Sequence, residues 1–464
     1  MAHPPSTRAP RAPARAPATA PARPEAPPAP RKGGWAASRE RLRAAATTEP
    51  GRLWIIGTVV AALVVAFGAV TAWEVTDRAS AADDVVSHSQ PLSADAASIY
   101  RSLADADTAA TSGFLAGSKE ARAVRERYES DIATASRLLV KAAANTTGSS
   151  ESAGSIARLN EQLPLYNGLI EQARANNRQG YPVGGAYLRY ANEQMAKTLL
   201  PAAQTLYEAE TGRLYEDYDQ AETWPYAALA VGAVALGALF WAQRRNFLRT
   251  NRVLNHGLVA ASGASVVVLL WLVAGHAVAA SDLSTSRTHG QESLKVLNDA
   301  RISSLQARAN ENLTLVARGA ITTAAGKDAY DESYKSQMKD LVAKLGSATG
   351  LADDDSGRTP VSDARAAVTE WQTRHEKVRT SDEAGDYTDA LDRVIGDSGS
   401  TGQSFDRVDA ALEQAIGHEQ REFTRAATDG RDALTGLPLG AAVLAVLGAA
   451  AAGVGISRRL AEYR

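Results

Sequence analysis

Residues 53–73 read LWIIGTVVAALVVAFGAVTAW, an apolar run without a charged side chain. Three further runs of this kind follow, and each is close to the ~20 residues with which an α-helix crosses a bilayer. Trp54 and Trp73 bracket the first run, as is typical of rings at a membrane interface. The four transmembrane helices that we expect are 53–73, 225–242, 258–280 and 435–456.

The first run could instead belong to a cleaved signal peptide, because Ala79-Ser80-Ala81 has the small-x-small form of a cleavage site. A signal peptide starts with a short charged segment, whereas about fifty residues precede this run. The three similar runs that follow also favour a membrane anchor.

Lysine and arginine near the ends of the spans predict the orientation of the chain, because basic residues are enriched on the cytoplasmic side. Residues 1–52 contain ten basic and three acidic residues, the link 243–257 contains four arginines and no acid, and the tail 457–464 is also basic. The whole chain has a formal net charge of -2, so the excess of acid lies in the long segments 74–224 and 281–434. We therefore expect a multi-pass plasma-membrane protein with both termini and the link cytoplasmic and the two long segments extracytoplasmic.

The N-terminal tail, residues 1–52, places most prolines of the chain among alanine and arginine. Such a composition cannot bury apolar surface, so we predict a disordered and partly polyproline-like tail. A basic spacer beside anionic lipid is the simpler interpretation, and a docking motif for a cytoplasmic partner is the alternative.

The two long segments are nearly equal in length, and both have helical patterns without sustained strand alternation. The chain has no cysteine, so these segments cannot rest on disulfide bonds, and packed long helices are favoured. Breaks that cut each segment into four helices are expected at Gly117 and Gly326, at NNRQGYPVGG (176–185) and SDEAGDY (381–387), and as longer loops at 143–155 and 347–360.

The two halves correspond at a few positions, which indicates a duplicated unit. Tyr128 corresponds to Tyr334, and Tyr166 corresponds to Trp371. We therefore predict an all-α membrane protein, in which four transmembrane helices are continuous with two extracytoplasmic antiparallel four-helix bundles.

The stretch SLADADTAATSGFLAG, residues 102–117, contains mostly small residues. The apolar positions around it recur at helical spacing, which predicts one stripe and a close-packed seam. Asp105 and Asp107 fall on the flanks of this stripe. We expect both carboxylates to be solvated or to face a partner.

No catalytic constellation is present in the sequence. The P-loop, HExxH and GxSxG motifs are absent, there is no cysteine, and the seven histidines do not pair at metal-ligand spacing. The acidic run Asp353-Asp354-Asp355 fails the ligand spacing of an EF-hand and is interpreted as a solvated linker. We expect neither enzymatic activity nor a metal or other cofactor.

Candidate partner-binding residues occur on both sides of the membrane. Tyrosines on bundle helices are most often core edges, but exposed tyrosine beside arginine suits recognition. A short arginine-rich link suits a cytoplasmic partner, and no nucleic-acid partner is expected. The candidates are Asp105, Asp107, Tyr187, Arg189, Tyr190, Arg244, Arg245, Arg249 and Arg252.

The run YRSLADADTAATSGFLAG followed by RERYESDI, in a chain with a basic tail, four spans and two similar helical ectodomains, resembles the GlnX-type membrane proteins. The resemblance implies a relay of extracellular glutamate or aspartate availability. In that family an extracytoplasmic solute-binding lipoprotein is thought to engage the ectodomain, and the signal passes to a cytoplasmic Ser/Thr kinase of the protein kinase G type. No ligand-contacting residue is carried over, because the family offers no site motif to map onto this chain.

Our leading hypothesis is a non-enzymatic transmembrane sensor or adaptor whose partners are membrane lipid, the solute-binding lipoprotein and the kinase, and a homodimer is left open. An acidic patch at Asp105 and Asp107 is a poor direct receptor for anionic glutamate, so a separate binding protein is expected to carry the amino acid. The alternative is a structural scaffold, or an accessory subunit of a transporter or cell-envelope complex. A transporter itself is disfavoured, because the spans nearly lack charge.

Overall fold

The computed structural model describes residues 49–145, 150–250, 255–396 and 398–461, and within these ranges all regular secondary structure is helical. The first half of the chain contains α2 (Glu49–Asp84), α3 (Gln90–Ala116), α4 (Arg122–Asn145), α5 (Ser150–Arg178), α6 (Val183–Gln194), α7 (Leu200–Glu222) and α8 (Tyr226–Thr250). The second half contains α9 (His256–Thr285), α10 (Glu292–Ala317), α11 (Ala329–Leu351), α12 (Asp355–Glu383), α13 (Tyr387–Ile395), α14 (Thr401–Leu434) and α15 (Leu437–Ala461).

In the part of the chain that the structure describes, three π-helical turns join consecutive helices into long ones. They are Val85–Ser89 between α2 and α3, Met195–Leu199 between α6 and α7, and Ser286–Gln291 between α9 and α10. Turns of this kind inside α-helices are often found at functional sites. The first and third π turns occupy corresponding places in the two halves.

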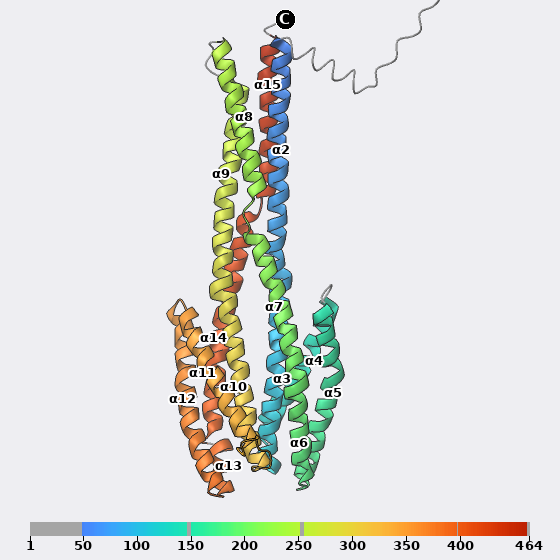
Figure 1. The fold of residues 1–464 in the computed structure, drawn as a ribbon, viewed down its shortest axis with the longest axis vertical. Helices are drawn as coiled ribbons and strands as arrows, with labels where there is room; N and C mark the ends of the chain where they lie inside the picture. Colours follow the sequence, from blue (N-terminus) through green and yellow to red (C-terminus); the bar gives the residue numbers. More distant parts are fainter. Residues whose placement is uncertain (1–48, 146–149, 251–254, 397, 462–464) are drawn as a thin grey trace, which may run out of the picture.

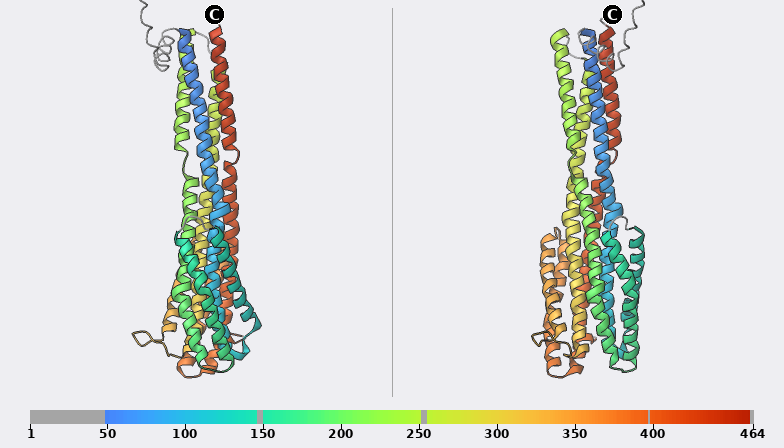
Figure 2. Two further views of the ribbon diagram at one scale, coloured as in Figure 1. Left: turned by 90° about the vertical axis from the view of Figure 1, so that its right-hand side faces the viewer. Right: turned by 45° about the vertical axis from the view of Figure 1, so that its right-hand side comes forward.

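The helices form two bundles side by side at one end of an elongated molecule, with α2, α8, α9 and α15 at the other end (Figures 1 and 2). The first bundle is α3–α7, and the second bundle is α10–α14, in which α13 is a short addition. The corresponding residues Tyr128, Tyr334, Tyr166 and Trp371 are all buried. One continuous apolar cluster contains residues of both bundles, so the bundles share a core. The predicted all-α architecture with two four-helix bundles is confirmed.

The short breaks expected from the sequence are present. Gly117, Gly180, Gly326 and Gly385 all have positive φ, a conformation that glycine adopts without strain. The breaks expected at 143–155 and 347–360 separate α4 from α5 and α11 from α12, but they are shorter than expected, because helices fill most of both stretches; residues 146–149 lie outside the described residues. Ser152, Ser155 and Ile156 are buried in α5, so packing in the bundle outweighs their loop-like composition.

Four helices of the described residues are long and apolar enough to cross a membrane. They pack closely through small residues: a Cβ added to Gly68 of α2 would lie 2.1 Å from Ala445 Cβ of α15. A Cβ on Gly257 of α9 would lie 2.2 Å from the carbonyl oxygen of Ala451. The expected packing of small-residue surfaces between spans is therefore present.

The spans do not all continue into the bundles in the same way. α2 and α9 run without interruption into α3 and α10. Between α7 and α8 the backbone of Thr223 is extended, and between α14 and α15 Thr435 is extended and Gly436 has φ +80°. The expectation that every arm runs straight into its span thus holds for two of the four.

Candidate functional site at the seam between the bundles

The small residues of α3 lie where the two bundles meet, a region that we call the seam. Thr108 Oγ1 donates to the carbonyl oxygen of Leu305 in α10 at 2.8 Å. Asn312 Nδ2 of α10 donates to Thr111 Oγ1 at 3.1 Å and to Ser112 Oγ at 2.8 Å. The predicted close-packed seam is confirmed. The small side chains of α3 also let α10 of the second bundle pack closely against this helix.

Asp107 is buried, with 3% of its surface exposed, so the expectation of a solvated carboxylate is wrong. Its oxygens accept hydrogen bonds from Tyr166 Oη at 3.1 Å and Asn192 Nδ2 at 2.7 Å. Burial raises the pKa of Asp107 to about 6, although these two hydrogen bonds act in the opposite direction. The cause of the error is that α3 is enclosed on both faces, whereas one stripe predicts one buried face.

We predict that acidification stabilises the first bundle through Asp107. The folded protein binds a proton at this carboxyl more tightly than the unfolded chain, because its pKa is raised from 3.8 to about 6. Stability therefore increases as the pH falls through about 6, by about 1 kcal/mol between pH 7 and pH 5. Hydrogen exchange of α3 and α5 peptides at both pH values measures the effect.

Asp107→Asn should keep the fold and lose this pH dependence. The exposed Glu126 of α4 offers a matched control, because Glu126→Gln should leave the dependence as it is in the wild-type protein. An Asp107→Asn variant with the same pH dependence would assign the effect to other groups.

Four charged residues form an ionic network across the seam, which we call the seam network: Asp105, Arg127, Arg301 and Asp409. Arg127 of α4 contacts Asp105 of α3 at 2.8 Å and Asp409 of α14 at 3.1 Å. Arg301 of α10 donates to Asp409 through Nε at 2.6 Å and Nη2 at 3.2 Å. Burial raises the pKa of Asp105, and the Arg127 guanidinium counteracts this effect. Asp409 of the second bundle thus accepts from arginines of both bundles.

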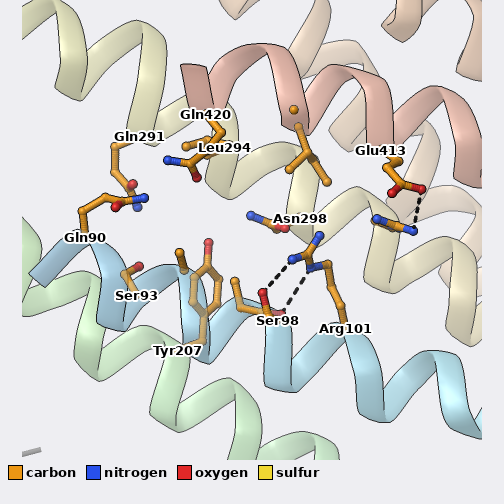
Figure 3. A pocket seen from close by; sticks show the side chains of 15 residues that line it. Gln90, Ser93, Ser98, Arg101, Tyr207, Gln291, Leu294, Asn298, Glu413 and Gln420 are labelled. Atoms are coloured by element: carbon orange, nitrogen blue, oxygen red, sulfur yellow. Dashed lines mark hydrogen bonds and ion pairs between the residues drawn. The ribbon is translucent and has the colours of Figure 1, made fainter. Parts of the chain in front are cut away.

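A cavity of about 300 Å³ lies in the seam beside this network (Figure 3). Its polar lining comes from both bundles and includes Gln90, Ser93, Ser98, Arg101, Tyr207, Gln291, Asn298, Glu413 and Gln420. Gln90 directly follows the first π turn, and Gln291 ends the third. The cavity therefore adjoins both of these turns.

Arg101 supplies a cation to this cavity. Its Nη2 donates to Ser98 Oγ at 2.8 Å, and among the described residues it forms no ion pair within 4.0 Å. Burial, together with the nearby Arg301, lowers the pKa of Arg101 to about 10, so the guanidinium stays charged at neutral pH. Asn298 is 6% exposed, and its Oδ1 has no hydrogen-bond partner. These groups can bind a small anion that also donates a hydrogen bond, such as an amino acid.

The core of the second bundle holds a buried charge network around Glu311. Arg308 Nη1 donates to Glu311 Oε2 at 2.6 Å, and Trp371 Nε1 donates to the same carboxylate at 3.2 Å. His375 lies between Glu311 Oε1, at 2.9 Å from Nδ1, and Asp331 Oδ1, at 3.1 Å from Nε2. Burial lowers the pKa of His375, but its bonds to the two carboxylates outweigh this effect and raise it.

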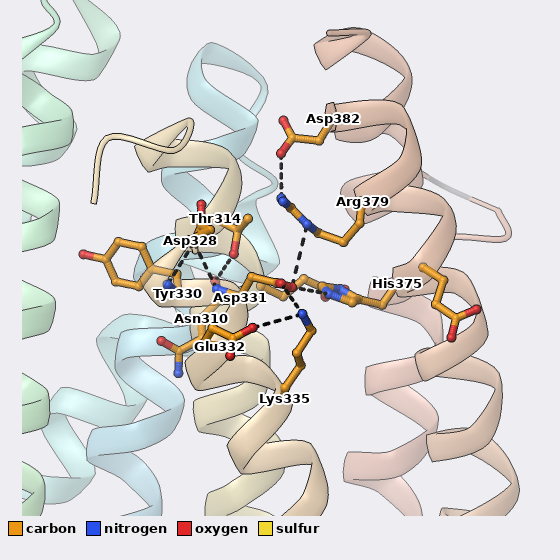
Figure 4. A network of polar contacts seen from close by, with 12 residues as sticks. Asn310, Thr314, Asp328, Tyr330, Asp331, Glu332, Lys335, His375, Arg379 and Asp382 are labelled. Atoms are coloured by element: carbon orange, nitrogen blue, oxygen red, sulfur yellow. Dashed lines mark hydrogen bonds and ion pairs between the residues drawn. The ribbon is translucent and has the colours of Figure 1, made fainter. Parts of the chain in front are cut away.

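Three cationic side chains converge on Asp331 (Figure 4). Lys335 Nζ lies 2.7 Å away, and His375 Nε2 and Arg379 Nε lie at 3.1 Å and 3.7 Å. Burial opposes ionisation, yet these partners hold the pKa of the Asp331 carboxyl well below its usual range. Neither Asp331 nor Glu311 was singled out from the sequence, because their partner His375 lies more than forty residues away along the chain.

The other candidate residues lie apart from the seam cavity. Tyr190 is 59% exposed, Tyr187 packs partly buried against the shared core, and Arg189 is half-buried. Arg244 of α8 is exposed, and the Arg245 guanidinium lies 5.5 Å from the Trp241 ring centroid. Arg252 and the side chain of Arg249 lie outside the described residues. The partner-binding role of all nine candidates stays a prediction.

Residues 81–219 match the family model of the actinobacterial sensor domain. The matched residues cover the end of α2, all of α3 to α6 and most of α7. No curated protein and no solved structure matches the chain. Together with the four apolar helices, the match supports a multi-pass membrane protein whose first bundle is similar to a sensor domain. A sensor domain also agrees with the lack of catalytic motifs in the sequence.

Proposed function

We propose that the protein is a non-enzymatic transmembrane sensor that receives a glutamate or aspartate signal at the seam and relays it to a cytoplasmic Ser/Thr kinase. In this proposal an extracytoplasmic solute-binding lipoprotein delivers the amino acid to the bundles. Both bundles are extracytoplasmic, membrane lipid surrounds the four spans, and both termini and the link 243–257 are cytoplasmic.

The observation that carries the proposal is that helices leading to all four candidate spans line one cavity. Gln90 belongs to α3, Tyr207 to α7, Asn298 to α10 and Glu413 to α14. A ligand or partner that changes the spacing of these helices also displaces the spans that follow them. The match of the sensor domain to the first bundle supports the same role.

The chemistry of the cavity supports a carboxylate signal. Among the described residues the Arg101 guanidinium forms no ion pair within 4.0 Å, and a charge-assisted hydrogen bond to a carboxylate contributes about 1.5–3 kcal/mol. A cavity of about 300 Å³ is at the lower end of known ligand sites, which suits a small ligand. In this proposal the anion binds beside Arg101, in a cavity that neither Asp105 nor Asp107 lines.

We predict that Arg101→Gln weakens binding of the amino-acid signal by about tenfold or more. The measurement is calorimetry on the full-length protein in nanodiscs, with glutamate alone, the lipoprotein alone, and both together. Arg122→Gln on exposed α4 is the matched control and should bind as the wild type does.

The three arms distinguish the routes. A heat of binding with glutamate alone would show that the protein binds the amino acid directly. A heat of binding only with the glutamate-loaded lipoprotein would show that this partner delivers the amino acid. No binding in any arm would overturn the receiver role. In proteoliposomes with the kinase added, a phosphorylation rate that does not change with the ligand would overturn the relay to the kinase. Co-purification with a permease or a cell-envelope enzyme would favour the scaffold function.

A further inference from the structure

A second cluster of ionisable side chains lies at the connection between α11 and α12, which is at the end of the second bundle nearest the candidate spans (Figure 1). Asp354 precedes α12 in the short connection from α11, and its Oδ1 accepts from the Gly357 backbone nitrogen at 2.7 Å. His418 and Glu422 stand one turn apart on α14. The cluster therefore joins the α11–α12 hairpin to α14.

Both carboxylates approach the same nitrogen atom. His418 Nε2 lies 3.3 Å from Asp354 Oδ1 and 3.3 Å from Glu422 Oε1. This nitrogen carries at most one proton, so it can donate to only one of the two oxygens. It is buried, and neither contact has hydrogen-bond geometry. Direct hydrogen bonding therefore does not account for the arrangement.

Two of the three ligand-to-ligand distances, those from His418 Nε2 to Asp354 Oδ1 and to Glu422 Oε1, match the edges of a metal-centred tetrahedron. The edge of a tetrahedron is about 1.63 times the distance from its centre to a corner, and zinc binds histidine nitrogen and carboxylate oxygen at about 2.0–2.1 Å. The expected ligand-to-ligand distance is thus roughly 3.3–3.4 Å. All three ligand atoms lie within 4.8 Å of one another.

The local charge also favours a cation. Among the described residues, Asp354 and Glu422 form ion pairs with His418 but with no lysine or arginine. Arg358, the cation nearest to Asp354 along the chain, pairs with Asp355 at 3.2 Å instead, and Arg421, which directly precedes Glu422, is exposed. Glu419 is buried next to the cluster, 3.3 Å from the place of a Cβ on Gly357, and adds a further carboxylate.

We propose that Asp354, His418 and Glu422 bind a divalent transition-metal ion of the zinc type. Three protein ligands leave the fourth tetrahedral position to water. Imidazole is a ligand for zinc and not for calcium or magnesium, which prefer oxygen. The bound ion fastens the α11–α12 hairpin to α14, the helix that precedes the fourth candidate span.

Cobalt titration of the full-length protein in detergent tests the site. Tetrahedral Co²⁺ coordination gives strong visible absorption, and the chain has no cysteine that could bind the ion elsewhere. We expect one equivalent of Co²⁺ to produce the bands and one equivalent of Zn²⁺ to remove them, while Ca²⁺ has no effect.

His418→Gln and Glu422→Gln should each weaken Co²⁺ binding by at least about tenfold, with circular dichroism confirming the fold. His88→Gln is the matched control, because His88 also lies one turn from a carboxylate, 3.2 Å from Asp84, but lacks a third ligand. Absence of the bands in the wild type, or equal affinity in both site variants, would overturn the proposal. Competition by Ca²⁺ at equal concentration would overturn the assignment to a transition metal.

Discussion

A Glu311→Gln variant is expected to lower the free energy of unfolding of the second bundle by about 3–5 kcal/mol. Glu311 is 1% exposed and neutralises the buried guanidinium of Arg308 as well as the His375 ring. Glutamine keeps the size of the side chain but removes its charge, so a cation remains in the core without a carboxylate beside it. The Trp371 indole would also lose a charged hydrogen-bond acceptor.

Hydrogen exchange of α10, α11 and α12 in the full-length protein measures this loss and separates it from the first bundle. The experiment is made at about pH 6, because the raised pKa of His375 keeps the ring protonated there. Glu376→Gln is the matched control, since Glu376 follows His375 on the exposed face of α12. Equal protection in the two variants would mean that solvent or a neighbouring group compensates Arg308.

Asp409→Asn is expected to weaken the association of the two bundles, lowering the free energy of separating them by about 2–5 kcal/mol. Asp409 is the carboxylate that Arg127 and Arg301 share, so its loss places two guanidinium groups face to face at the seam. Glu413→Gln is the matched control one turn further along α14. It should cost less than about 1 kcal/mol, because Glu413 is 70% exposed and lies 3.6 Å from Arg301.

Distances between spin labels on the two bundles provide the measurement. The chain has no cysteine, so Val140→Cys on α4 and Val342→Cys on α11 introduce two labels at exposed positions without a background signal. A broader or longer distance distribution in Asp409→Asn, but not in Glu413→Gln, is the expected result. Identical distributions in the two variants would show that the shared apolar core alone holds the bundles together.

The sequence predicts the architecture well, because each apolar run and each glycine break is a local signal. The run at 53–73 lies within α2, and the breaks at Gly117 and Gly326 separate helices as expected. The correspondence of Tyr166 and Trp371 extends to their partners, since Tyr166 binds Asp107 and Trp371 binds Glu311 at equivalent places in the two cores. The predicted correspondence between the two halves thus extends to buried polar contacts.

The sites are less predictable because they join residues that are distant along the chain. A single apolar stripe predicts a solvated flank for Asp107, whereas Tyr166 of α5 and Asn192 of α6 enclose this carboxylate within its own bundle. The scarcity of charge around 102–117 was the available signal, because a helix with few charges on any face is usually buried all round. Asp354 was interpreted as part of a solvated linker, and only tertiary structure brings His418 beside it.

Two of the connections between bundles and spans are helical and two contain extended backbone, so the four spans are not coupled to the bundles in the same way. A continuous helix resists compression along its axis. We therefore expect α2–α3 and α9–α10 to transmit an axial displacement from the seam to the starts of α2 and α9. The backbone is extended at Thr223 and Thr435, so we expect α7 and α14 to pass an axial displacement less directly to α8 and α15. An axial displacement at the bundles would then reach Glu49 and His256, which adjoin the basic tail and the arginine-rich link along the chain.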